Sequence, residues 1–113
     1  MQRRTILFAL GSTTMNSFSQ VTSIIRVAAL ADGKVLVDGV PVSLSDLDAR
    51  LKLLKAANGV VWYYRENPAS EPRPEALRAI KAIFENRLPV SMSSKPDFSD
   101  VIDASGHSKP RVP

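Results

Sequence analysis

The chain has 113 residues, which is enough for one domain with a single hydrophobic core. It contains no cysteine, which excludes disulfides and thiolate zinc sites, and its 44% hydrophobic and 23% charged residues are typical of a globular protein. The net charge of +4 has two interpretations: contact with an anionic partner, or positive charge dispersed over the surface. We favour dispersed charge, because no block of like charges is present. Basic and aromatic residues do not alternate as in RNA-binding sheets, so nucleic acid is not an expected partner.

The first twenty residues, 1–20, have two interpretations. Arg3 and Arg4 precede an apolar run at 6–10, as in a weak export signal. That run is shorter than the ~7 to 15 residues usual for a signal and no clear cleavage site follows, so a short strand or arm is the alternative. No run reaches the ~18 to 20 apolar residues that cross a bilayer, so we predict no membrane span.

The next segment has the pattern of a strand hairpin. Residues 21–31 are rich in Val, Ile and Ala and predict a strand. The Asp-Gly pair at 32–33 suits a tight turn, and the alternating residues 34–37 should pair back on the first strand. A second Asp-Gly pair at 38–39 leads into a short extended piece at 40–42.

The first helix has clear start and stop signals. Ser43 and Asp46 form a capping box, and Asn58 followed by Gly59 is a typical helix end. Four leucines at spacings of three and four form one apolar stripe, which should face the core. They are Leu44, Leu47, Leu51 and Leu54.

A second strand-helix-strand unit follows. The run Val-Val-Trp-Tyr-Tyr at 60–64 predicts a central strand covered on both faces. After a proline-containing loop at 65–73, Pro74 suits the first position of a second amphipathic helix that ends near 86–87. Residues 88–93 predict the last strand of this unit.

The remaining residues have weaker patterns. Residues 94–96 predict a turn, and 97–103 predict either a helical turn or a partial edge strand. Residues 104–113 are polar and end in proline, so we predict a flexible tail.

These elements predict an α/β fold with one domain over residues 21–103, between the N-terminal segment and the tail. Two strand-helix-strand units in one sheet imply parallel neighbours joined by right-handed crossovers, and the hairpin adds an antiparallel edge. We therefore expect a two-layer α/β sandwich, a β-hairpin followed by β-α-β-α-β, with a mixed sheet and both helices packed on one face.

Few residues suggest chemistry on a substrate. His107 lies in the predicted tail, and the aspartates repeated every third residue over 97–103 match no known calcium loop, so solvated acids or a helix cap explain them better than a metal site. Glu66 and Glu71 lie beside arginines, which indicates surface pairing more than a catalytic acid. No nucleophile elbow or phosphate-binding loop occurs. We expect no enzyme activity, no cofactor and no metal.

Protein contacts are better supported than catalysis. The leucine stripe is expected in the core, whereas aromatic residues are enriched at binding centres. Side chains alternate along a strand, so at least one of Trp62 and Tyr63 is expected in the core. The candidate partner-binding residues lie near strand ends or in turns: Tyr63, Tyr64, Arg65, Lys95, Pro96, Asp97 and Phe98.

Four segments resemble the soluble domain of the ExbD/TolR biopolymer-transport family: 32–34, 37–43, 47–58 and 88–96. The similarity covers roughly residues 27–96, and the ribbon-to-helix element is its most specific part. It implies a non-enzymatic domain that dimerises, contacts TonB-like or peptidoglycan partners and belongs to a membrane energy-transduction complex. The family's N-terminal membrane helix and its proton-handling aspartate are not matched, and the bulkier residues 63–74 depart from the family pattern.

The sequence leaves three functional hypotheses. The first is a partner-binding or dimerising adaptor at the bacterial envelope, in line with the resemblance. The second is a cytoplasmic binding protein on the same scaffold, such as an immunity-type or regulatory inhibitor. The third, a small enzyme, lacks a nucleophile-base pair. The compartment stays open: cytoplasmic by default without a clear targeting segment, periplasmic if the resemblance carries function.

Overall fold

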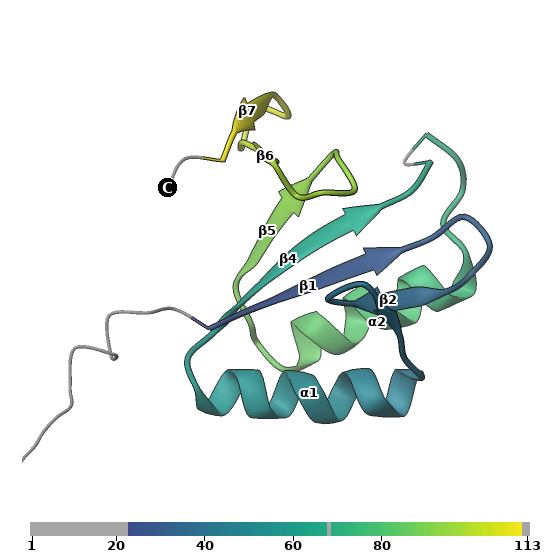
Figure 1. Cartoon of the computed structure of the whole chain (residues 1–113), viewed down its shortest axis with the longest axis vertical. Coiled ribbons are helices and arrows are strands. Elements are labelled where there is room, and N and C mark those ends of the chain that lie inside the picture. The colour runs from purple at the N-terminus through teal and green to yellow at the C-terminus, as the bar shows by residue number, and fades with distance from the viewer. Residues whose placement is uncertain (1–22, 68, 112–113) are drawn as a thin grey trace, which may run out of the picture.

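The computed structural model of the chain describes residues 23–67 and 69–111. The predictions for residues 1–20 lie outside this part. The elements follow in chain order (Figure 1): β1 Ile24–Ala29, β2 Val35–Val37, β3 Val40–Pro41, α1 Leu44–Ala56, β4 Val60–Arg65, α2 Pro74–Glu85, β5 Val90–Ser93, β6 Asp100–Ile102 and β7 Ser108–Pro110.

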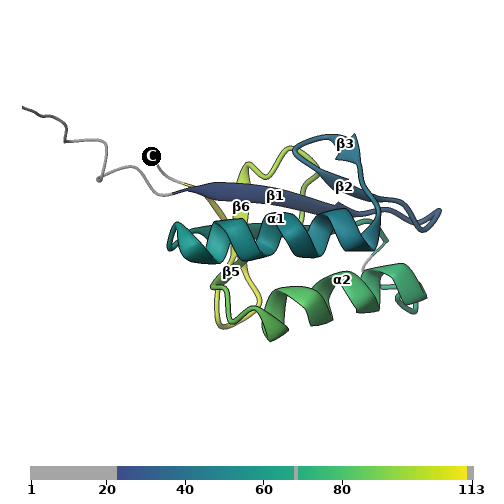
Figure 2. The same ribbon diagram turned by 90° about the horizontal axis from the view of Figure 1, so that it is seen from below.

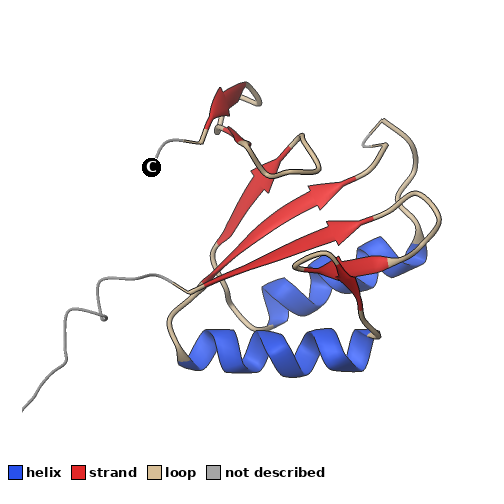
Figure 3. Ribbon diagram, viewed as in Figure 1, coloured by secondary structure: helices blue, strands red, loops and turns tan. Residues whose placement is uncertain are grey.

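The main sheet has five strands in the order β3-β2-β1-β4-β5 (Figure 3). β1, β4 and β5 are parallel, whereas β2 and β3 are antiparallel to their neighbours. Val27 at the centre of the sheet is opposite Val37 on one side and Tyr63 on the other. The predicted fold, a hairpin followed by β-α-β-α-β in a mixed sheet, is confirmed.

Local chemistry sets the bounds of both helices. The Ser43 hydroxyl accepts a hydrogen bond from the Asp46 amide at 3.1 Å, which caps the first turn of α1. Asn58 then adopts a left-handed φ of 55°, which ends the helix. α2 begins at Pro74, whose missing N–H costs nothing at this position, and Arg87 takes a φ of 54° just after its end.

Both helices cover the same face of the sheet, and the core lies between these two layers (Figure 2). Alternate residues of each strand face the helices, while the leucine stripe of α1 and the small residues of α2 face the sheet. The buried core consists of Val27, Ala29, Val35, Val37, Leu47, Leu51, Leu54, Val61, Tyr63, Ala76, Ala79, Ile83 and Leu88.

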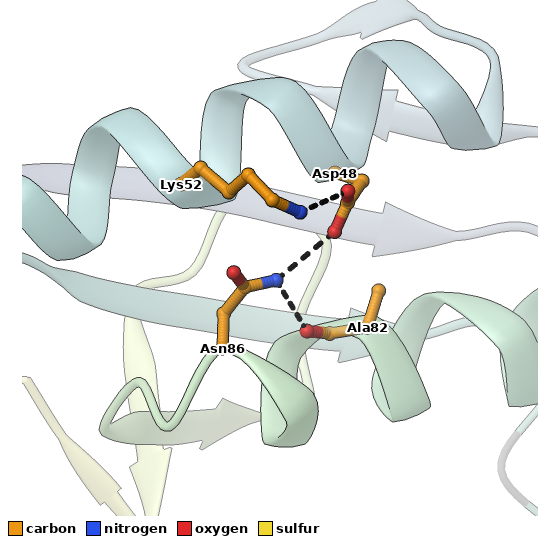
Figure 4. A network of polar contacts seen from close by, with 4 residues as sticks. All are labelled: Asp48, Lys52, Ala82 and Asn86. Carbon is orange, nitrogen blue, oxygen red and sulfur yellow. Dashed lines mark hydrogen bonds and ion pairs between the residues drawn. The ribbon is translucent and has the colours of Figure 1, made fainter.

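A polar bridge joins the two helices (Figure 4). The side-chain amide of Asn86 donates to the Asp48 carboxylate at 3.1 Å and to the Ala82 carbonyl at 2.8 Å. Lys52, one turn further along α1, also donates to Asp48. Asn86 thus caps the end of α2 and fixes its distance from α1, whereas the exposed Lys52 pair contributes little stability.

The C-terminal part differs from the prediction of a tail. β6 and β7 form a separate antiparallel hairpin, in which Ile102 is opposite Ser108. The carboxylate of Asp103 accepts hydrogen bonds from the amides of Ser105 and His107, both at 2.9 Å, and so fixes the connecting turn. Residues 108–110 are therefore a strand, and 97–103 contain a strand rather than a helical turn.

Two leucines of α1 offer a matched test of this architecture. Leu51 is fully buried between the layers, whereas Leu53 is 73% exposed. We expect Leu51→Ala to lower the free energy of unfolding by about 2–5 kcal/mol, because it leaves a cavity in the core. Leu53→Ala should change it by less than about 0.5 kcal/mol. Urea unfolding followed by circular dichroism measures both, and equal effects would contradict the assigned helix orientation.

Candidate functional site

The sheet face opposite the helices, here called the open face, carries aromatic and basic side chains. Strand alternation and register place the following residues on it: Arg26, Ala28, Leu36, Trp62, Tyr64, Ser91 and Ser93. Arg26 is opposite Trp62, and Ala28 is opposite both Leu36 and Tyr64. Both helices of residues 23–67 and 69–111 lie on the other face, so these side chains depend on other elements for cover.

The predicted partner-binding residues divide between the two faces. Tyr63 is buried under the helices, and this burial raises the pKa of its hydroxyl. Arg65 lies on the same side as Tyr63 and donates to the Ser70 carbonyl at 3.1 Å. Tyr64 and the turn at 95–98 lie on the other side, so the structure does not bring all seven residues into one site.

Phe98 connects the turn at 95–98 to the open face. Its ring meets that of Tyr64 edge-on, with the ring centres 6.3 Å apart. The Phe98 backbone has a φ of 58°, which is uncommon for a bulky residue, and its amide donates to the Lys95 carbonyl at 3.0 Å. The Phe98 ring is thus buried against the sheet, and the backbone that positions it there is strained.

A hollow of about 370 Å³ lies beside Phe98, and we call it the open-face hollow. Ala28 and Leu36 come from neighbouring positions of β1 and β2, and Asp38 follows directly after β2. The turn at 95–98 supplies the opposite wall. The complete lining is Arg26, Ala28, Leu36, Asp38, Gly39, Pro96, Asp97 and Phe98.

Trp62 lies against two arginines. The guanidinium of Arg111 is 3.9 Å from the centre of a Trp62 ring, and that of Arg26 is 4.8 Å from it. Arg111 also donates to the Phe98 carbonyl at 3.0 Å, the Asp100 carbonyl at 2.9 Å and the Ser91 hydroxyl at 2.8 Å. Arg111 therefore attaches the β6–β7 hairpin to the open face.

Asp100 holds the start of this hairpin to the end of β5. Its carboxylate is only 2% exposed and accepts hydrogen bonds from the hydroxyls of Ser93, Ser94 and Ser108 and from the Ser94 amide. Because these four donors stabilise the charged form, they hold the pKa of Asp100 well below its usual range. A buried aspartate with four donors is a structural anchor rather than a proton donor at neutral pH.

A second hollow, which we call the edge groove, lies on the helix-covered side where α2 meets β5. Its volume is about 200 Å³, and it is mostly apolar. Leu77 is 53% exposed and Met92 is 41% exposed at this place, and β5 is the last strand of the sheet. The lining residues are Tyr63, Arg65, Pro72, Ala76, Leu77, Ile80 and Met92.

The glutamates considered as candidate acids line a third hollow, of about 180 Å³, beyond the end of β4. Glu66 accepts a hydrogen bond from the Ala31 amide at 2.8 Å and so fixes the loop after β1. Glu71 lies in the same lining as Arg65 and Arg73. The geometry favours loop stabilisation over proton transfer.

Sequence reasoning missed Arg26, Asp38 and Arg111 as parts of the open face. The alternation of β1 could have placed Arg26 on one face, but its pairing with Trp62 depends on strand order. Arg111 stood in a predicted tail, and no local pattern linked it to Trp62.

The residues that the structure describes contain no cluster of three or more His, Cys, Asp or Glu side chains arranged to hold a metal ion. None of their helices combines the length and the apolar character needed to cross a membrane.

No protein-family model matches the chain, and no curated protein matches its sequence.

The position of Asp100 predicts a pH dependence of stability. A carboxyl whose folded pKa is lowered stabilises the fold above its unfolded value, and this contribution disappears as pH falls through the folded pKa. The difference in unfolding free energy between the native chain and Asp100→Asn should thus be largest near neutral pH and shrink below the ordinary value of 3.8. Urea unfolding at several pH values tests this, with the exposed Glu71→Gln as control. A constant difference would contradict the assigned role.

Proposed function

We propose that the chain is a non-enzymatic protein-interaction module that pairs with a second copy of itself along β5. The observation that carries the proposal is the outer edge of β5, which pairs with no other strand of the described residues and lies beside exposed apolar residues. An edge strand offers free N–H and C=O groups to another strand. Two β5 strands related by a two-fold axis would pair antiparallel and join both sheets, which is a self-complementary interface.

The edge groove supplies the apolar part of this interface. Leu77, Ile80 and Phe84 recur on α2 at spacings of three and four, so they share one side of the helix. Leu77 and Phe84 are 53% and 62% exposed, and Met92 continues the patch onto β5. Pairing along β5 would bring these residues next to their counterparts in the second copy and remove them from water.

The resemblance to the ExbD/TolR soluble domain supports an adaptor role. Domains of that family dimerise and contact partners of membrane energy-transduction complexes. The proposal extends this role to the present chain: a dimeric adaptor at the bacterial envelope that binds a protein partner. The polar contacts of Glu66 and Asp100, which anchor loops, support a binding role over catalysis.

The alternative is a cytoplasmic binding or inhibitor protein on the same scaffold. Fractionation of cells that express the full chain with a C-terminal tag separates the two hypotheses. We expect the tagged chain in the envelope or periplasmic fraction, with or without a shortened N-terminus by intact mass. Recovery of the full-length chain in the cytoplasm would favour the alternative. It would not test the pairing along β5, which has its own experiment.

Met92→Lys tests the pairing along β5. A charged side chain on an edge strand opposes strand addition, so we expect the dimer dissociation constant to rise at least tenfold, as measured by sedimentation equilibrium. Leu53→Lys is the control, because Leu53 is also an exposed apolar residue, at 73% against 41% for Met92, but lies on α1. Circular dichroism verifies folding. A monomeric native chain at about 1 mM, or equal weakening by both variants, would refute the pairing.

A further inference from the structure

The open-face hollow combines an apolar floor with acidic walls. Ala28 and Leu36 form the floor, and the ring of Phe98 stands beside them. Asp38 lies on one side, in the turn after β2, and Asp97 lies on the other, in the turn after β5. The hollow therefore has an apolar surface that one apolar side chain can contact, with a carboxylate on each side of it.

The charges of this hollow are unbalanced. Among the described residues that line it, Arg26 is the one cation, and its guanidinium lies 3.8 Å from a carboxylate oxygen of Asp38. The same guanidinium is also held over Trp62. Asp97 forms no ion pair with any described residue, and Lys95 influences it only at longer range. The lining thus carries an excess of one negative charge although the whole chain is basic.

Both carboxylates are fixed before any partner arrives. A carboxylate oxygen of Asp38 accepts from the Arg26 amide at 3.1 Å, and one of Asp97 accepts from the Ser99 amide at 3.0 Å. The hydroxyl and the amide of Ser99 lower the pKa of Asp97, so it is charged at neutral pH. Fixed charges bind a cation at a smaller entropic cost than mobile ones do.

We propose that the open-face hollow binds a segment of a partner protein in which an apolar side chain is flanked by lysine or arginine. The apolar side chain would lie on Ala28 and Leu36, and the basic groups would reach Asp38 and Asp97. This surface is separate from β5 and the edge groove, so the inference does not depend on the proposed self-association. Charge complementarity sets the class of partner, because an acidic segment would meet two carboxylates.

A peptide titration of the full chain tests the proposal directly. The probe is acetyl-Gly-Lys-Leu-Lys-Gly-amide, and its matched control is acetyl-Gly-Glu-Leu-Glu-Gly-amide. We expect the basic peptide to shift the amide NMR signals of residues around the hollow, with a dissociation constant at least tenfold lower than that of the acidic peptide. The difference should shrink as salt is raised, because screening weakens exposed charge pairs.

The double variant Asp38→Asn/Asp97→Asn identifies the site. Asparagine retains the side-chain oxygen that accepts the amide hydrogen bond and tolerates the left-handed φ of 50° at position 38, so both turns should persist. We expect at least fivefold weaker binding of the basic peptide. The control variant Asp46→Asn/Glu85→Gln removes the same charge from α1 and α2, on the other side of the sheet, and should bind as the native chain does.

Three results would overturn the proposal. The first is equal affinity for the basic and acidic peptides. The second is equal weakening by the hollow variant and the helix variant, which would indicate general electrostatics. The third is a set of hollow signals that shift with protein concentration in the absence of peptide, which would place a second copy of the chain on this surface.

Discussion

Both helices lie on one face of the sheet, as the rule of right-handed crossovers between parallel strands requires, and the cover of the other face depends on this constraint. β1 reaches β4 through α1, and β4 reaches β5 through α2, so neither connection covers the open face. Trp62 and Tyr64 on the central strand then need another partner. The chain supplies it after β5, with Phe98 against Tyr64 and Arg111 over Trp62.

The cover over the open face is held by polar groups rather than by a second core. Asp100 joins the end of β5 to the hairpin through three serine hydroxyls, and Arg111 satisfies three oxygens while it stacks on Trp62. This network favours one position of the hairpin, because burying the carboxylate without its hydrogen-bond donors would cost free energy. It is also small, so it covers β4 and β5 and leaves the hollow over β1 and β2.

Predictions from sequence succeeded where the signals are local. The Ser43 cap, the leucine spacing of α1 and the Asp-Gly turns each act within a few residues, and they were enough for the element order and the fold class. The β6–β7 hairpin was missed because its stability depends on residues far apart, such as Asp100 with Ser93 and Arg111 with Trp62. Alternation along β4 showed that neighbouring aromatics face opposite ways, but only packing against the helices identifies Tyr63 as the buried one.

The positions of the two candidate surfaces bear on an adaptor role. The edge groove lies beside α2 on the helix-covered side, whereas the open-face hollow lies between two turns on the opposite side. Their lining residues do not overlap, and β4 lies between β1, which lines the hollow, and β5. A second copy along β5 would extend the sheet without covering the hollow. One dimer would then present two identical acidic hollows, and a partner with two basic segments would bind it more tightly than either segment alone.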